Sequence, residues 1–545
     1  MPLRVRWLGR VPYREALALQ HALFERGSEQ HLLLLEHPHV FTYGPNAHLD
    51  TNLLVDPAAV GAELVSVKRG GDITYHGPGQ LVGYPILNVP NSLGAAQHVA
   101  ALQQLVIRTL ADFGIVAHVE PEYPGVWVDP ADPRKICAIG VRLANGRTMH
   151  GFALNVQPDM RYMREHIVPC GIGDKPVTSI AEELARAADG ADAADPQAVD
   201  VAACDMAAVV DAVARHAAAM WGASERQDIA RADMPQGLAL SARKPDWLRT
   251  KVQLGAPVLA THHTVRDHGL VTVCEEAGCP NLSECWAAGT ATFMVLGERC
   301  TRACGFCLVD TQRPLPPSAD EPQRVAAAVA QMGLEHAVLT MVARDDLADG
   351  GFAHVAACVR AIREARPTTQ VETLVSDAKG DQSALDLLIA ERPDVFNHNM
   401  ETVARLQRRV RPSAGYARSL AVLAHAKAAG LTIKSGFMLG LGETDAEVEG
   451  LLADLASIGA DIVTIGQYLR PTGQHLPVAR WAEPAEFQHW AGVGETLGIG
   501  HVEASPLTRS SYHAREAAAS VSPISVSVPV PVPVPVSVGS SARRR

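Results

Sequence analysis

Hydrophobic residues follow two different spacings in the first part of the chain. Short apolar runs at His31–Leu35 and Leu81–Val89 have the length of buried strands. Tyr13–Arg26 and Ala95–Phe113 instead repeat apolar residues at helical spacing. These strands and helices interleave, with many glycines between them, which predicts a mixed α/β domain over residues 1–222.

A more regular pattern begins at Arg324, where helical spacing and short apolar runs alternate. Helices are predicted over Arg324–Met332, Phe352–Ala365, Ala417–Gly430 and Asp445–Ile458, and strands over Ala337–Thr340, Gln370–Val375, Thr432–Leu439 and Ile462–Gln467. Repeated strand–helix units predict a parallel sheet with helical crossovers, open or closed into a barrel. In a barrel, active groups are expected at the carboxyl ends of the strands.

The segments around these patterns set the expected domain boundaries. Val201–Trp221 has helical spacing and is expected to close the first domain, whereas Ala185–Ala198, rich in Ala and Asp, is expected to be a surface insertion. Residues 223–243 have no clear periodicity and are predicted to be a linker. The second domain is then expected to span residues 244–516.

Residues 517–545 form a low-complexity tail of Val, Pro and Ser. Val528–Val536 alternates Val with Pro, a pattern that cannot build the interior of a sheet and is typical of polyproline II or disorder. We therefore expect a disordered, passive tail.

Composition narrows the class of protein. A chain of 545 residues suffices for about two to four domains. The formal net charge of −11 disfavours nucleic acid as a partner, because phosphate binding requires a basic face. No stretch reaches the ~18 apolar residues of a membrane helix, and the first residues lack the apolar core of a signal peptide. The sequence therefore predicts a cytoplasmic protein that binds neither membrane nor nucleic acid.

Six of the ten cysteines lie within 34 residues, in two triplets. The triplets are Cys274-Glu-Glu-Ala-Gly-Cys279-Pro-Asn-Leu-Ser-Glu-Cys285 and Cys300-Thr-Arg-Ala-Cys304-Gly-Phe-Cys307. In a reducing compartment, clustered cysteines are more often metal ligands than disulfides. Three thiolates on a four-iron cluster leave one iron open, whereas a structural zinc site is closed by four ligands. The alternative to two iron–sulfur clusters is a pair of zinc sites completed by histidines such as His262 or His263.

The second triplet resembles the signature of the radical S-adenosylmethionine enzymes, and the first resembles the auxiliary-cluster motif of the lipoyl synthase family. The resemblance covers about residues 243–516. It extends to Lys244-Pro-Asp-Trp-Leu248, Arg344-Asp-Asp-Leu347, Asp349-Gly-Gly351, Asn397-His-Asn399, Lys434-Ser-Gly436, Leu439-Gly-Leu-Gly-Glu443, Gln467-Tyr468 and Arg509-Ser-Ser-Tyr512.

This resemblance implies a partial (β/α) barrel that holds two [4Fe-4S] clusters. It implies that Cys300, Cys304 and Cys307 hold the cluster that binds S-adenosylmethionine, from which one electron releases a 5′-deoxyadenosyl radical. It also implies that Cys274, Cys279 and Cys285, with Ser511 as fourth ligand, hold the cluster that gives up sulfur. The reaction would insert two sulfur atoms at C6 and C8 of a protein-bound octanoyl chain, and would need a reduced electron donor.

Two stretches depart from the lipoyl synthase pattern. Thr340-Met-Val342 stands where the family usually has Thr-Ser-Val, and in Ser376-Asp-Ala-Lys-Gly380 an alanine follows the aspartate where an aromatic residue is usual. These departures concern local cofactor contacts rather than the cluster ligands.

The first domain carries a different set of candidate residues. Arg69–Gln80 is dense in glycine, which lets backbone amides approach a substrate closely, and it lacks the Gly-Lys-Ser/Thr of a Walker loop. Cys170 lies between a proline and a glycine and is a candidate nucleophile if a nearby group takes its proton. Lys135 is a candidate for that group, because a buried lysine loses its proton more readily.

The order of these motifs, with Arg134–Gly140 and His150–Asn155, resembles the lipoyl(octanoyl) transferases over about residues 5–222. The resemblance implies an α+β fold like that of biotin and lipoate ligases, with Cys170 as the acyl-carrying nucleophile and Lys135 as general acid/base. The residues that it implies for the acyl pocket are Arg69, Gly70, Gly71, Asp72, Ile73, Thr74, Tyr75, His76, His150, Gly151 and Phe152.

Together the two resemblances imply a bifunctional enzyme of lipoate biosynthesis. Its expected partners are octanoyl-acyl carrier protein and the lipoyl domains of 2-oxoacid dehydrogenase E2 subunits and glycine cleavage H protein. Two alternatives remain open. In one, the first domain is an ATP-dependent lipoate or octanoate ligase, which needs no nucleophilic cysteine. In the other, one domain is an inactive scaffold.

Overall fold

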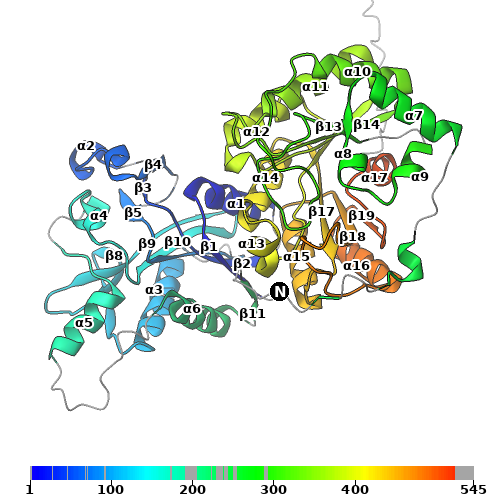
Figure 1. Cartoon of the computed structure of the whole chain (residues 1–545). Helices are drawn as coiled ribbons and strands as arrows, with labels where there is room; N and C mark the ends of the chain where they lie inside the picture. The colour runs from blue at the N-terminus through cyan, green and yellow to red at the C-terminus, as the bar shows by residue number, and fades with distance from the viewer. Residues whose placement is uncertain are drawn as a thin grey trace, which may run out of the picture.

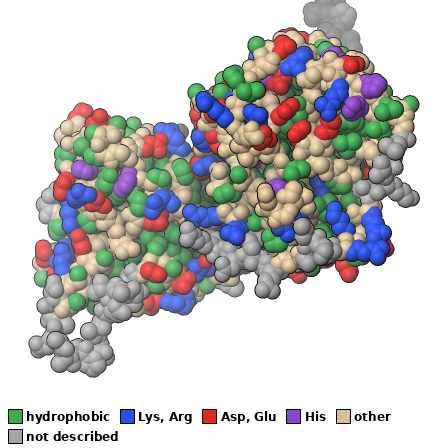
Figure 2. All heavy atoms as spheres, viewed as in Figure 1, with side chains coloured by type: hydrophobic (Ala, Val, Ile, Leu, Met, Phe, Trp, Pro, Cys, Tyr) green, Lys and Arg blue, Asp and Glu red, His purple; other side chains and the backbone are tan. Residues whose placement is uncertain are grey.

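The structure is a computed structural model, and it describes residues 3–26, 29–45, 47–67, 69, 72–90, 94–171, 175–190, 205–222, 224–228, 237–238, 243–249, 255–287 and 292–521. Two α/β domains lie side by side, with helix α1 (Tyr13–Arg26) at their junction (Figure 1). Acidic and basic side chains are interspersed over the visible face of both domains (Figure 2). Among the described helices, none has both the length and the apolar character needed to cross a membrane.

The first domain is built on an eight-stranded mixed sheet. In spatial order its strands are β11 (Ser224–Asp228), β1 (Leu3–Arg10), β2 (Gln30–Glu36), β6 (Gln80–Ile86), β10 (Arg147–Asn155), β9 (Arg134–Ala144), β8 (Tyr123–Val128) and β7 (Ala117–Glu120). A small sheet beside it has the order β4 (Glu63–Ser66), β3 (Val40–Tyr43) and β5 (Thr74–His76). The remaining helices of this domain are α2 (Leu49–Asn52), α3 (Ala95–Ala111), α4 (Arg161–Arg164), α5 (Ile180–Gly190) and α6 (Met206–Trp221).

Both faces of the large sheet are buried, which explains the run of leucines in β2. Leu32 and Leu34 belong to the core that includes α3 and α6. Leu33 and Leu35 face the opposite way and pack with α1, because successive side chains of a strand alternate between the two faces. The core on the α1 side continues without interruption into the second domain.

The second domain has an open eight-stranded sheet with β12 (Val271–Thr272) at one edge and β19 (His501–Ala504) at the other. Between them, in chain order, lie β13 (Thr292–Val295), β14 (His336–Met341), β15 (Gln370–Leu374), β16 (Val395–Asn397), β17 (Thr432–Leu439) and β18 (Ile462–Gln467). All neighbours pair in parallel except β12 and β13. The predicted parallel sheet is therefore present, in its open form.

Helices surround this sheet (Figure 1). They are α7 (Ala256–Asp267), α8 (Val273–Glu276), α9 (Leu282–Ala287), α10 (Glu321–Met332), α11 (Phe352–Ala365), α12 (Gln382–Ile389), α13 (Gln407–Val410), α14 (Tyr416–Ala428), α15 (Asp445–Ser457), α16 (Pro484–Thr496) and α17 (Ala514–Val521). Helices α1 and α11 and strands β17 and β18 begin and end at the residues that the hydrophobic pattern predicts.

The structure differs from the sequence-based expectation at two boundaries. Residues 224–228, within the expected linker, form β11 and pair in parallel with β1. The segment Ser-Glu-Arg-Gln-Asp has no apolar residue to signal a strand, and it is ordered by backbone pairing at the sheet edge. Helix α17 continues to Val521, beyond the expected domain end at 516, because Ala517 and Ala518 are buried. The rest of the tail, 522–545, lies outside the described residues.

Candidate functional site

Lys135 is buried near the start of β9. Its ammonium lies 4.8 Å from the centre of the Trp127 ring, a cation–π contact that holds the charge away from bulk water. Its backbone pairs with the segment that follows the cysteine turn: Lys135 N–H donates to the Pro176 carbonyl and Thr178 N–H donates to the Lys135 carbonyl, both at 2.9 Å. The fold thus brings the segment after Cys170 against the predicted general acid/base.

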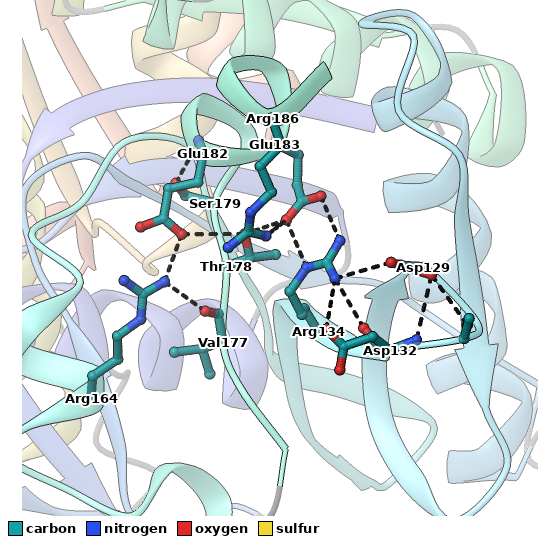
Figure 3. A network of polar contacts seen from close by, with 11 residues as sticks. Asp129, Asp132, Arg134, Arg164, Val177, Thr178, Ser179, Glu182, Glu183 and Arg186 are labelled. Atoms are coloured by element: carbon teal, nitrogen blue, oxygen red, sulfur yellow. Dashed lines mark hydrogen bonds and ion pairs between the residues drawn. The ribbon is translucent and has the colours of Figure 1, made fainter. Parts of the chain in front are cut away.

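A polar network fixes this arrangement from the other side (Figure 3). The guanidinium of Arg134 donates two hydrogen bonds to Glu183 of α5, at 3.0 and 3.1 Å. Thr178 Oγ1 donates to the same carboxylate at 2.6 Å. Burial alone would raise the pKa of Glu183, but the bonds from Arg134 and Thr178 outweigh it and lower that pKa. The start of β9 and the 177–179 segment are therefore held together by an ionised carboxylate.

Cys170 lies in a single 3₁₀ turn, Pro169–Gly171, and its side chain is outside the described residues. The neighbouring Gly171 has φ +71°, and a Cβ there would lie 3.1 Å from Asp72 Oδ2. Asp72 in turn accepts a hydrogen bond from Asn52 Nδ2 at 2.7 Å. The cysteine turn and the glycine-rich segment are therefore neighbours, although nearly 100 residues separate them in sequence.

A small cavity of about 50 Å³ opens next to β5 and β10. Its lining includes six of the predicted pocket residues, namely Arg69, Thr74, His76, His150, Gly151 and Phe152. Burial lowers the pKa of His150 to about 3 and that of His76 well below its usual range, so both imidazoles are neutral at pH 7. The lining therefore combines two neutral imidazoles with the Arg69 guanidinium and the Phe152 ring.

The other predicted pocket residues lie elsewhere. Ile73 and Tyr75 are fully buried in a separate core, and the Tyr75 hydroxyl is 2.7 Å from His39 Nδ1. They alternate with Thr74 and His76 along one strand, and a strand presents only every second side chain to a given face. Gly70 and Gly71 lie outside the described residues. Two lining residues that the sequence did not single out are Tyr13 and Tyr84.

In the second domain, the second cysteine triplet occupies the loop that follows β13. Two backbone hydrogen bonds hold this loop. Cys300 N–H donates to the Asp310 carbonyl at 2.8 Å, and Gly305 N–H, between the second and third cysteines, donates to the Val410 carbonyl at 2.9 Å. Burial raises the pKa of Cys304, and raises that of Cys307 to about 12. These thiols are thus protonated unless a metal displaces the protons, as soft metal centres do.

The first triplet lines a cavity of about 380 Å³ together with Ser511 and Arg509. Thr292 Oγ1 donates to Ser511 Oγ at 2.9 Å, and Asn281 Nδ2 donates to the Leu507 carbonyl at 2.8 Å. These bonds bring Ser511 beside cysteines more than 200 positions earlier. A cavity with three thiols and a hydroxyl on its wall has the donor set expected for the auxiliary cluster.

The zinc alternative requires three or four side chains that converge on a single metal ion. Within the part of the chain that the structure describes, no three His, Cys, Asp or Glu side chains are arranged to hold one metal ion. His262, considered above as a zinc ligand, packs against Trp286 with ring centres 5.8 Å apart.

Several buried charges around the second triplet were not singled out from the sequence. Arg302, inside the cysteine motif, donates to Asp345 through two nitrogens at 2.8 Å and to Asp377 at 2.6 Å. Glu401, with φ +65°, is half-buried near the Arg411 and Arg509 guanidiniums. In the sequence, only the position of Arg302 between Cys300 and Cys304 could have indicated that these charges belong to the site.

Comparison with known proteins agrees with the division of the chain into two catalytic domains. Residues 12–198 match the family model of the lipoyl protein ligase A/B catalytic domain, and residues 294–455 match that of the radical SAM superfamily. The structure of a lipoate protein ligase from Thermoplasma acidophilum aligns with 42% of this chain and 88% of the ligase chain. The sequence identity is 17% and the TM-score is 0.34.

Lipoyl synthases are much more similar in sequence. The lipoyl synthase of Methylococcus capsulatus is 52% identical over 282 residues, which cover 51% of this chain and 88% of that protein. The lipoyl synthase of Chlorobaculum parvum is 50% identical over 285 residues, covering 52% of this chain and 97% of its own. The predicted fold classes are confirmed, and S-adenosylmethionine and iron–sulfur chemistry follow from the radical SAM match. The chain therefore belongs to the lipoyl synthase family through its C-terminal half, which a ligase-type catalytic domain precedes.

Proposed function

We propose that this chain carries out two successive steps of lipoate biosynthesis on one carrier lysine. The first domain transfers octanoyl from octanoyl-acyl carrier protein to the lysine of a lipoyl domain, as found in 2-oxoacid dehydrogenase E2 subunits and glycine cleavage H protein. The second domain inserts sulfur at C6 and C8 of the bound chain. The observation that carries the proposal is the fusion of the two catalytic domains, each with its own cysteine set.

In the transfer step, the Cys170 thiolate attacks the octanoyl thioester, forming a new thioester and releasing the carrier thiol. The amine of the target lysine then attacks this thioester, giving the amide and restoring Cys170. Lys135 moves the protons, taking one from the incoming nucleophile and giving one to the leaving thiol. The pairing of Lys135 with residues 176–178 supports this role, because it ties the base to the cysteine segment.

In the sulfur-insertion step, the chain's own residues hold and orient two [4Fe-4S] clusters. The proposed ligands are Cys300, Cys304 and Cys307 for one cluster, and Cys274, Cys279, Cys285 and Ser511 for the other. When bound, the first cluster and S-adenosylmethionine supply a radical that abstracts hydrogen from an unactivated methylene. A serine oxygen is a harder ligand than a thiolate and binds iron less strongly, which suits a cluster that must release sulfur.

Acyl transfer is tested by incubating the protein with octanoyl-acyl carrier protein without ATP, and mapping adducts by mass spectrometry. We expect octanoyl on Cys170, and its loss in Cys170→Ser. Cys137→Ala is the matched control, because Cys137 is a fully buried packing residue of β9. ATP-dependent transfer without a cysteine adduct would instead identify the first domain as a ligase.

Cluster content is tested by anaerobic reconstitution. We expect about eight irons and eight sulfides per chain, falling to about four of each in Cys274→Ala/Cys279→Ala. Zinc without sulfide would rule out the radical reaction. Activity of the second domain alone, with no transfer by the first, would support the scaffold alternative.

A further inference from the structure

Helix α1 lies at the junction of the two domains, where it packs against α14 of the second domain (Figure 1). Tyr13, at its first position, lines the small cavity of the first domain. Glu15, two residues later, points away from that cavity and is 6% exposed. One turn of helix thus contributes a side chain to each of two regions.

The Glu15 carboxylate meets two elements of the second domain. Its Oε1 accepts a hydrogen bond from Arg418 Nε of α14 at 2.9 Å. It also lies against Gly380, where a Cβ would be only 2.5 Å from the same oxygen and φ is +83°. Gly380 ends the 3₁₀ turn Ala378–Gly380, whose N-cap residue is Asp377.

From Arg418, alternating charges continue into the second domain. Arg418 Nη1 lies 3.4 Å from Asp377 Oδ2, and the other oxygen of Asp377 accepts from Arg302 Nη2 at 2.6 Å. Asp377 is fully buried and Arg302 is 6% exposed. Water therefore screens these charges poorly, and each affects the position of the next.

The series ends in the loop of the second cysteine triplet. Arg302 stands between Cys300 and Cys304, and its backbone N–H lies 3.4 Å from Cys300 Sγ. The Arg302 guanidinium is anchored on one side by Asp345 and on the other by Asp377, which it shares with Arg418. Without the Glu15 charge, Arg418 would have Asp377 as its remaining carboxylate partner among these residues. Arg418 and Arg302 would then compete for the same carboxylate.

We propose that Glu15 of the first domain is a positioning residue for the cysteine loop of the second domain, acting through Arg418, Asp377 and Arg302. The proposal rests on the proposed function only in taking this loop to hold the first cluster. It makes the geometry of the sulfur-inserting site depend on the presence of the transferase domain.

The first test uses the full-length, cluster-free protein and hydrogen exchange. Burial raises the pKa of Glu15 to about 7, so the measurements are made at pH 8, where the carboxylate is ionised. Glu15→Gln is expected to speed amide exchange in residues 299–310 roughly tenfold, because residues of one salt-bridge network are coupled by energies of about that size. Glu25→Gln is the matched control on the same helix, since its side chain is 59% exposed. Equal exchange in both variants overturns the proposal.

The second test separates positioning from a general loss of stability. Glu15→Gln should add nothing in an Arg418→Gln background, whereas additive effects would overturn the route through Arg418. Glu15→Asp, which keeps the charge, should restore most of the protection. After reconstitution, Glu15→Gln should shift the reduction potential of the first cluster and leave octanoyl transfer unchanged. If the wild-type protein binds no iron and sulfide, the proposed function fails, while the exchange experiment still decides the proposal.

Discussion

At the scale of single residues, burial decides the charge state of His37. Its Nδ1 is 2.7 Å from the Val11 carbonyl and its Nε2 is 2.8 Å from the Tyr84 hydroxyl. A carbonyl only accepts, so Nδ1 carries the proton and Nε2 accepts from Tyr84 in the neutral ring. Burial lowers the pKa of His37 to about 4, against an ordinary value of 6.5.

This shift predicts a loss of stability in acid. Between pH 6.5 and 4 the unfolded chain binds a proton at His37 that the folded chain does not, so the stabilisation is complete above pH 6.5 and falls as pH drops toward 4. At pH 5 the loss is about 2 kcal/mol for this residue. Urea unfolding at pH 7 and pH 5 measures it, and the difference should shrink in His37→Asn.

The control for this measurement is His489→Asn. His489 is exposed on α16, and its substitution should leave the pH dependence as in the wild type. An unchanged pH dependence in His37→Asn would show that other groups account for the acid sensitivity.

At the scale of one element, α16 contains two glycines with opposite surroundings. Gly492 is exposed, and a Cβ there would meet no atom within 4 Å. Gly494 is buried, and a Cβ there would lie 2.8 Å from Val502 Cγ2 on β19. The same substitution on one helix therefore isolates helix propensity from packing.

We expect Gly492→Ala to stabilise the second domain by about 1 kcal/mol, because alanine loses less backbone entropy in a helix. Gly494→Ala should destabilise it by about 1 kcal/mol, since the clash with a stiff, β-branched neighbour outweighs that gain. Thermal unfolding of the two variants provides the comparison. A stabilised Gly494→Ala would mean that β19 moves aside at little cost.

At the scale of the whole molecule, a buried ion pair joins the domains. Arg6 of β1 donates two hydrogen bonds of 3.1 Å to Asp454 of α15, and Tyr416 donates to the same carboxylate at 2.8 Å. Arg6 is 2% and Asp454 4% exposed. Burial alone would raise the pKa of Asp454, but Arg6 outweighs it and the pKa is lowered.

Removing this carboxylate should uncouple the domains. Asp454→Asn takes away the charge opposite a buried guanidinium, at a cost of roughly 3–5 kcal/mol. Calorimetry should then show two separate unfolding transitions in place of a more cooperative one. Asp386→Asn, at a carboxylate whose side chain is 61% exposed, serves as the control. A calorimetric trace like that of the wild type would indicate that apolar contacts alone hold the domains together.

The sequence by itself determined the elements with strong periodicity and the cysteine sets. The bounds of α1 and α11 could be predicted from apolar residues at helical spacing, and those of β17 and β18 from short, largely apolar runs that are buried on both faces. Both patterns are local properties of the chain. The two cysteine triplets could be recognised because the three cysteines of each are close in sequence. The strand β11 could not, since it consists of polar residues ordered by a neighbour more than 200 positions away.

Only the tertiary structure decided which residues share a site. It separated Thr74 and His76 at the cavity from Ile73 and Tyr75 in a core, and brought Ser511 within hydrogen-bond distance of Thr292. It also joined Glu15 to Arg418 across the domain boundary. Such contacts depend on how whole elements pack and on the burial of charges between them, and neither is encoded in the local spacing of residues along the chain.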